Sequence, residues 1–211
     1  MAKIKAVIFD MDGVLIDAKD WHYAALNKAL ELFGFSISRY DHLTTYDGLP
    51  TKKKLEMLSL ESDLPTELHV FINEMKQKFT MEMIYTQCKP KFIHEYALSM
   101  LKSKGYQLAV ASNSIRETVE VMMEKSSLIR YLDETISASD VSYPKPHPEI
   151  YQVTMKKLCC LPEECLIVED NQNGIKAAKA SGAYVLEVRD VYDVNLTNIE
   201  NYIAKIEGSK I

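Results

Sequence analysis

Short apolar runs alternate with helical stretches through most of this chain, and this alternation limits the folds that are open to it. Each run is rich in Val, Ile, Leu or Ala and is bounded by turn residues, which is typical of buried strands. The expected strands are residues 6–9, 107–111, 134–138, 165–168 and 183–188. Because helical patterns separate the last four, we predict an α/β fold, a doubly wound parallel sheet with helices on both faces.

The segment between the first two expected strands contains no convincing strand. Apolar positions recur there at helical spacing, before Gly34 and again after Pro50. We therefore expect two domains in this chain. Residues 1–17 and 86–211 would form a Rossmann-like α/β core, and residues 18–85 would form an inserted α-helical cap.

Composition and charge argue against several other classes of protein. The chain is 47% hydrophobic and 26% charged, as in ordinary folded proteins. Its net charge is −5 with both signs interleaved, whereas a nucleic-acid-binding protein would show a basic stripe. No stretch approaches the roughly 18 apolar residues of a membrane span, and no signal peptide is visible. We expect a cytoplasmic monomer or weak homodimer without nucleic-acid or membrane partners.

The four cysteines fit the same compartment. Cys88, Cys159, Cys160 and Cys165 are too few and too irregularly spaced for a disulfide framework. They also lack the Cys-x-x-Cys or Cys/His spacing of a metal site. We expect buried, reduced thiols.

Polar side chains lie where the expected strands end. Ligands of doubly wound sheets bind outside the carboxyl ends of the strands, so these side chains are expected to converge. They are Asp10 and Asp12 after the first strand, Ser112 and Asn113 after the second, Glu169 and Asp170 after the fourth, and Lys145 before a helix.

The chemistry of these residues fits a phosphate group and a divalent cation. Asp10 and Asp12 share one side of the chain if the extended geometry continues past Phe9, and two such carboxylates repel each other unless a cation compensates them. Magnesium is usually held by one or two carboxylates plus substrate phosphate. A hydroxyl, a backbone N–H and a lysine suit phosphate oxygens, and an aspartate can form an aspartyl-phosphate.

Each residue alone has a plainer explanation. Ser112 and Asn113 could be no more than a helix cap, and Lys145 could be a solvated loop lysine. Glu169 and Asp170 could cap a helix and interact favourably with its dipole. Their occurrence together, in this order, favours the catalytic interpretation.

The sequence resembles the haloacid-dehalogenase-like (HAD) superfamily over nearly its whole length. The resemblance lies in four ordered motifs: Asp10-Met11-Asp12-Gly13-Val14-Leu15, Ser112-Asn113, Lys145-Pro146 and Glu169-Asp170-Asn171-Gln172-Asn173-Gly174. The helical insert after the first motif resembles the cap of the β-phosphoglucomutase-like branch. That branch, as the resemblance implies, contains mostly sugar-phosphate phosphatases and the mutase itself.

The resemblance implies a role for each core residue. Asp10 would be the nucleophile, and Asp12 the general acid that then acts as base. Mg²⁺ would be held by the carboxylates of Asp10 and Asp170 and the backbone carbonyl of Asp12. Glu169 would be a further ligand or a group that supports the ligands.

The phosphoryl group would contact three other residues of the core. Ser112, the backbone at Asn113 and the lysine side chain of Lys145 would hold it, as the resemblance implies. These three complete the expected core site.

Cap residues are expected to choose the substrate. His22 could help Asp12 manage its proton, hold the cap closed, or be a partly buried helix histidine. Thr51 stands where the branch's mutase has a phosphate-gripping arginine, and Lys52 follows it in a lysine run that could equally be a solvated face. The missing arginine argues against mutase activity, because lysine does not replace a bidentate grip.

We therefore predict a Mg²⁺-dependent phosphatase that acts on a small phosphorylated metabolite, with a sugar phosphate as the expected class. The alternative enzyme is a β-phosphoglucomutase-like phosphosugar mutase. A non-catalytic binding or scaffold protein with the same fold is less favoured, because a pseudoenzyme gains nothing from mutually repelling carboxylates.

Overall fold

The computed structural model describes residues 3–208 of the chain. The chain forms two compact units, one from the described parts of Met1–Asp17 and Lys89–Ile211 and one from Ala18–Cys88. The helix that precedes the second junction, α4 (His69–Gln87), runs through Tyr85 without a break. The break between the units therefore falls three residues after the expected boundary at residue 85.

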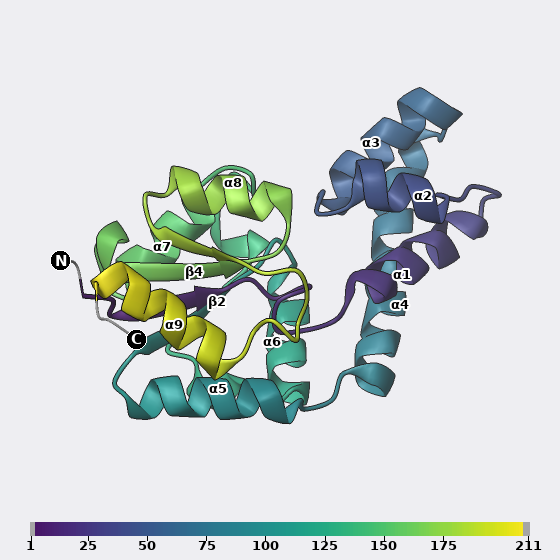
Figure 1. The fold of residues 1–211 in the computed structure, drawn as a ribbon. Helices are drawn as coiled ribbons and strands as arrows, with labels where there is room; N and C mark the ends of the chain where they lie inside the picture. The colour runs from purple at the N-terminus through teal and green to yellow at the C-terminus, as the bar shows by residue number, and fades with distance from the viewer. Residues whose placement is uncertain (1–2, 209–211) are drawn as a thin grey trace. The chain divides into compact units, whose positions relative to one another are not determined.

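The first unit, the α/β core, contains a five-stranded parallel sheet (Figure 1). Its strands are β1 (Ala6–Phe9), β2 (Gln107–Ala111), β3 (Glu134–Ile136), β4 (Cys165–Glu169) and β5 (Tyr184–Glu187). They are arranged in the order β3-β2-β1-β4-β5, which confirms the predicted doubly wound parallel sheet. The order reverses between β1 and β4, and in such sheets the ligand crevice opens at the carboxyl ends of these two strands.

Helices cover both faces of the sheet. They are α5 (Phe92–Ser103), α6 (Arg116–Lys125), α7 (Glu149–Lys157), α8 (Gln172–Ala180) and α9 (Leu196–Glu207). Figure 1 shows α7 and α8 on one face and α5 and α9 on the other. Contacts of α7 with β2 and β3, and of α8 with β4 and β5, place these two helices over the whole width of their face.

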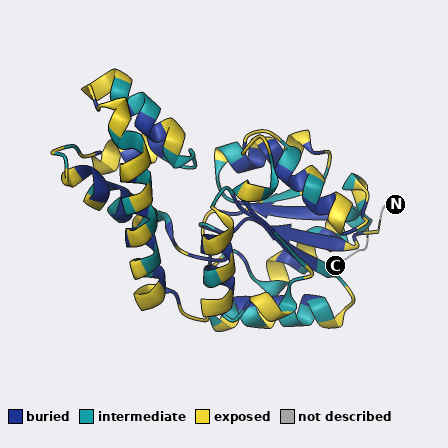
Figure 2. Ribbon diagram, turned by 180° about the vertical axis from the view of Figure 1, so that it is seen from behind, coloured by how far each residue is buried: buried dark blue, intermediate teal, exposed yellow. Residues whose placement is uncertain are grey.

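The central strands are buried on both sides, as Figure 2 shows in dark blue. All four residues of β1 are fully buried, and their side chains alternate between the two faces. Ala6 and Ile8 pack with Tyr151 in the cluster beneath α7 and α8. Double-sided burial explains why these strands read as continuous apolar runs.

The ends of three expected strands differ from the structure. β4 continues to Glu169, one residue beyond the expected residues 165–168. The strand expected at residues 134–138 stops at Ile136, because Ser137 caps a single 3₁₀ turn, Ala138–Asp140, by accepting a hydrogen bond from the Ser139 N–H. The last strand is Tyr184–Glu187 and is shorter than the expected residues 183–188. Two further 3₁₀ turns lie at Ile129–Tyr131 and Pro162–Glu164.

The second unit, the helical unit, has no strand among its residues. Its elements are α1 (Lys19–Glu31), α2 (Arg39–Asp41), a turn of π-helix (His42–Tyr46), α3 (Thr51–Ser62), a 3₁₀ turn (Thr66–Leu68) and α4. Its own apolar core includes Leu26, Leu55 and Ile72 from α1, α3 and α4. Residues 39–46 are helical as well, and Ser38 begins this segment by accepting a hydrogen bond from the Asp41 N–H.

The cysteines are all free thiols. Three are buried as expected, but Cys159 is exposed, which corrects that prediction. Its φ of 54° places it in the left-handed turn that follows α7. Within residues 3–208, none of the helices is both long enough and apolar enough to cross a membrane.

Candidate active site

The first aspartate is placed by the end of β1. The Asp10 N–H donates to the Val168 carbonyl at 3.0 Å, so pairing with β4 continues one residue beyond the strand. The chain then turns sharply at Gly13, whose φ of 90° favours glycine, and the Gly13 N–H donates to the Ile16 carbonyl. Asp10 is buried, and Asp12 accepts a hydrogen bond from the Ser114 hydroxyl at 3.1 Å through Oδ2.

Lys145 joins the ends of three strands. Its Nζ donates to Asp10 Oδ1 at 2.5 Å, to Glu169 Oε1 at 2.7 Å and to the Ala111 carbonyl at 2.9 Å. These three bonds use all three donors of the ammonium group. The side chain is 4% exposed, so the alternative of a solvated loop lysine is wrong.

Asn113 fixes the backbone of Lys145. Its Oδ1 accepts from the Lys145 N–H at 2.9 Å, and its Nδ2 donates to the Lys145 carbonyl at 3.3 Å. Ser112 is buried, and its Oγ accepts from the Ser114 N–H at 3.1 Å. The alternative of a helix cap is wrong for both residues, because α6 begins at Arg116 and neither side chain reaches its first turn.

Glu169 is saturated with hydrogen bonds. Its Oε1 accepts from Lys145 and from the Tyr151 hydroxyl, at 2.7 and 2.6 Å. Its Oε2 accepts from the backbone N–H groups of Asp170 and Asn171, at 3.0 and 3.2 Å. The carboxylate therefore fixes both the lysine and the loop that carries Asp170.

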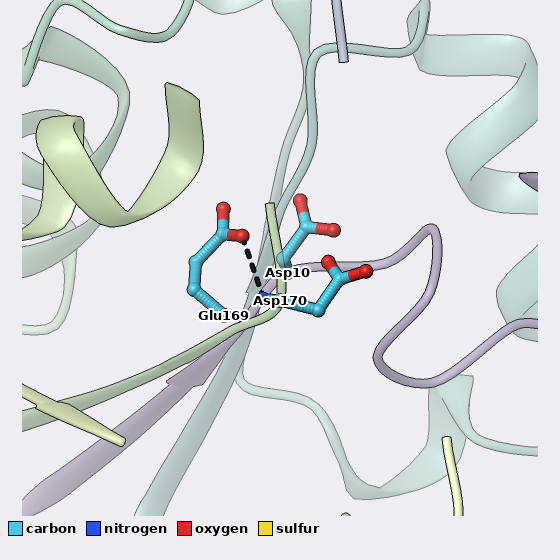
Figure 3. Close-up of side chains that lie close together, drawn as sticks. All are labelled: Asp10, Glu169 and Asp170. Atoms are coloured by element: carbon cyan, nitrogen blue, oxygen red, sulfur yellow. Dashed lines mark hydrogen bonds between the residues drawn. The ribbon is translucent and has the colours of Figure 1, made fainter. Parts of the chain in front are cut away.

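Three acidic side chains gather at this edge of the sheet. Asp10, Glu169 and Asp170 each offer an oxygen, and these oxygens lie within 4.8 Å of one another. Figure 3 shows the three carboxylates grouped where β1 and β4 end, with the bond from the Asp170 N–H to Glu169 dashed. Clustered carboxylate oxygens are ligands that Mg²⁺ accepts, so this donor set fits the expected ion.

Burial and like charge govern the electrostatics of the site. Burial raises the pKa of Asp10 well above its ordinary value, and Glu169, Asp170 and Asp12 raise it further against the opposing effect of Lys145. Burial lowers the pKa of Lys145, but Asp10 and Glu169 outweigh it and hold that pKa above its ordinary value. The lysine therefore stays charged in a pocket with excess negative charge, which favours binding of a further cation.

Sequence reasoning missed two residues of the site, Ser114 and Tyr151. Ser114 follows the predicted Ser112-Asn113 step by one residue, and its position near a strand end was the available signal. Tyr151 gave no separate signal, because an aromatic residue on the apolar face of α7 looks like any other core residue.

The three predicted cap residues lie in the helical unit. His22, on α1, is partly buried, with its Nδ1 3.4 Å from Lys76 Nζ. Thr51 is the first residue of α3, and Lys52 is exposed. The lysine run is not a uniform solvated face, because Lys54 is only 8% exposed.

His42, in the π-helical turn, is a second histidine of this unit that sequence reasoning did not select. It is 1% exposed, its ring contacts that of Tyr23, and neither ring nitrogen has a hydrogen-bond partner among residues 3–208. Burial lowers its pKa to about 4, and the nearby charge of Lys54 contributes to the shift. His42 is therefore neutral at pH 7.

We expect His42 to make folding sensitive to acid. Its folded-state pKa lies below the ordinary value of 6.5, so the unfolded state binds the proton first and stability falls as the pH drops from about 6.5 to 4. Between pH 7 and 5 the loss attributable to His42 should approach about 2 kcal/mol. Urea unfolding of the wild type and His42→Phe at both pH values measures it; parallel pH dependence in the two proteins would contradict the assignment.

The fold and the site together define a class of protein. A doubly wound sheet that gathers carboxylates and one buried lysine at its carboxyl edge is a Rossmann-like α/β enzyme scaffold. A family model described as haloacid dehalogenase-like hydrolase matches residues 7–188. The match spans most of the chain, and the chain therefore belongs to the haloacid dehalogenase-like hydrolases.

Relatives and solved structures agree with this membership. The chain is 29% identical over 182 residues to a phosphorylated carbohydrates phosphatase from Thermotoga maritima, a match that covers 85% of this chain and 82% of that protein. It is 31% identical over 179 residues to a phosphoglycolate phosphatase from Aquifex aeolicus, with coverage of 85% and 82%. The predicted superfamily and the prediction of a phosphoric monoester hydrolase are confirmed.

A β-phosphoglucomutase structure from Clostridium difficile matches the fold with a TM-score of 0.82. The match covers 97% of this chain and 99% of that one, at 22% identity. Likeness at this level of identity shows the fold alone, and it agrees with the predicted α/β core and inserted helical segment.

Proposed function

We propose that this chain is a Mg²⁺-dependent phosphatase that hydrolyses a small phosphorylated metabolite, with a sugar phosphate as the substrate class, through an aspartyl-phosphate on Asp10. The observation that carries the proposal is the buried Lys145 ammonium, which donates a hydrogen bond of 2.5 Å to Asp10 Oδ1. A fixed carboxylate beside a fixed positive charge is suited to attack on an anionic phosphate ester.

The chemistry divides between the two aspartates of the first motif. An oxygen of Asp10 attacks phosphorus and the bond to the leaving oxygen breaks, while Asp12 gives that oxygen its proton. Asp12 then takes a proton from water, whose oxygen attacks phosphorus and releases inorganic phosphate and Asp10. The Ser114 hydroxyl, 3.1 Å from Asp12 Oδ2, supports the orientation that both steps require.

The remaining core residues hold the ion and the phosphoryl group. Asp10 and Asp170 would hold Mg²⁺ with the backbone carbonyl of Asp12, and the bound ion would supply positive charge to the phosphoryl oxygens. Of the two roles open to Glu169, its four hydrogen bonds favour support of the ligands. Ser112 and the backbone at Asn113 would bind the phosphoryl oxygens. The Lys145 ammonium, which donates to Asp10 Oδ1, would supply positive charge beside them.

We propose that the helical unit selects the substrate through Thr51 and Lys52. His22 would assist in proton transfer or in closure of the cap. The names of two relatives, a phosphorylated carbohydrates phosphatase and a phosphoglycolate phosphatase, support a small phosphorylated metabolite. Mutase activity stays the alternative, favoured by the fold likeness to β-phosphoglucomutase and opposed by Thr51 at the expected arginine position.

Phosphate release from a panel of phosphosugars and other small phosphate esters separates the functions. A phosphatase releases inorganic phosphate from one or more of them in a Mg²⁺-dependent way. A mutase converts a 1-phosphate into a 6-phosphate with little release. A scaffold protein does neither, and that result across the whole panel would contradict the proposal.

Mg²⁺ is expected to stabilise the fold as well as support turnover. An ion bound to the folded state alone at 100 times its Kd adds about 2.7 kcal/mol, which raises the melting temperature of a chain this long by about 5 °C or more. Asp170→Asn should remove most of the increase. Asp20→Asn, which changes an exposed carboxylate of the helical unit, should keep it. An equal increase in all three proteins would contradict the assigned site.

A further inference from the structure

Tyr151 lies beneath the lysine and carboxylate network of the site. It is fully buried on α7, and its hydroxyl donates to Glu169 Oε1 at 2.6 Å. The same oxygen accepts from Lys145 Nζ at 2.7 Å. Two donors, one neutral and one charged, therefore share a single carboxylate oxygen.

The ring of Tyr151 also contacts the ammonium group directly. Lys145 Nζ lies 4.8 Å from the ring centroid, within the range of a cation–π interaction. All three ammonium donors are already used, by Asp10, Glu169 and Ala111. The aromatic face therefore contacts the ammonium without competing for these donors.

Sharing Glu169 Oε1 affects the balance between the two carboxylates that attract Lys145. A carboxylate oxygen that accepts from two donors holds each of them less strongly than it would hold one. The Tyr151 hydroxyl thus weakens the hydrogen bond between Glu169 and the Lys145 ammonium. The ammonium then interacts more strongly with Asp10 Oδ1. Burial, with Glu169 and Asp10 contributing, raises the pKa of Tyr151 well above its ordinary value, so the phenol stays a donor.

We propose that Tyr151 is a positioning residue of this active site. It determines where the Lys145 ammonium lies between Glu169 and Asp10. The inference rests on the proposed phosphatase function. Tyr151 suits the role because a helix carries it, and groups on rigid elements hold site geometry more closely than groups on loops. Its side chain acts on the site through its contacts with Glu169 and Lys145.

The test is Tyr151→Phe, with Tyr202→Phe as its matched control. Tyr202, on α9 of the same unit, donates its hydroxyl to the Val185 carbonyl at 2.7 Å. Each substitution removes one hydroxyl and one short hydrogen bond and keeps the ring. Phosphate release from the best substrate of the panel is measured per folded protein, with the melting temperature of each variant.

We expect Tyr151→Phe to lower kcat about tenfold and to change KM less than about twofold. Without the hydroxyl, the Lys145 ammonium would move from Asp10 toward Glu169, and this charge acts mainly on the transition state. Tyr202→Phe should keep the wild-type kcat. Tyr151→Leu, which also removes the ring, should lower kcat further. Equal kcat values in Tyr151→Phe, Tyr202→Phe and the wild type would overturn the inference and leave the phosphatase function intact. A wild type that releases no phosphate would overturn the proposed function, and this inference with it.

Discussion

Replacing Asp10 with asparagine is expected to lower kcat by at least about 10⁴-fold, the scale seen when an enzyme loses its nucleophile. An amide oxygen is a far weaker nucleophile than a carboxylate, so no covalent phosphoryl group forms at this position. The fold should stay intact, because asparagine has the same shape and its Oδ1 can still accept from Lys145 Nζ. Phosphate release under saturating substrate measures the loss.

The melting temperature of Asp10→Asn without added metal serves as the control. It should not fall much below that of the wild type, because the substitution removes one of three crowded acidic groups. Asp20→Asn provides the matched activity control on the exposed surface. Turnover within tenfold of the wild type in Asp10→Asn would exclude Asp10 as the nucleophile.

Replacing Gly174 with alanine is the second substitution with a large expected effect. An added Cβ would lie 1.7 Å from Glu169 Oε1 and 2.1 Å from its Cδ, although alanine is the better helix former by about 1 kcal/mol. Glu169 cannot yield cheaply, because four hydrogen bonds hold it. We expect a loss of about 3 kcal/mol in stability and, from the displaced lysine, about 100-fold in kcat.

A double-mutant cycle with Glu169→Ala tests the steric reason. Removing the glutamate side chain removes the atoms that the new Cβ would meet, so Gly174→Ala should cost little or even stabilise the protein in that background. Unfolding in urea gives the free energies of all four proteins. The same cost in both backgrounds would show that Gly174 matters for a reason other than the close approach of Glu169.

The sheet and the convergence of the site could be predicted from the sequence because both follow from local patterns. Apolar runs such as Ala6–Phe9 are buried on both faces and are easily distinguished from the helices between them. Once the sheet is parallel, the chain position of Asp10, Lys145 and Asp170 is enough to bring them to one edge. The resemblance to a known superfamily then suggested the roles that we propose for them.

Other features depend on contacts that no local pattern contains. The sharing of Glu169 Oε1 by Tyr151 and Lys145 joins two elements to a third, and on sequence grounds Tyr151 is only a core aromatic residue. The π-helical turn that buries His42 lacks the apolar periodicity by which helices are recognised. The burial of Lys54, two positions after the exposed Lys52, likewise follows from packing within the helical unit.

The most direct test of the central claim is detection of the phosphoryl group on Asp10. Asp12→Asn keeps the nucleophile but lacks the proton donor and base, so an activated substrate such as an aryl phosphate should phosphorylate it and the intermediate should accumulate. Rapid acid quench, borohydride reduction and peptide mass spectrometry then locate the modified residue. We expect homoserine in place of Asp10 in the tryptic peptide Ala6–Lys19. If Asp12→Asn releases one equivalent of the phenol from the aryl phosphate and Asp10 is nevertheless unmodified, Asp10 is not the nucleophile.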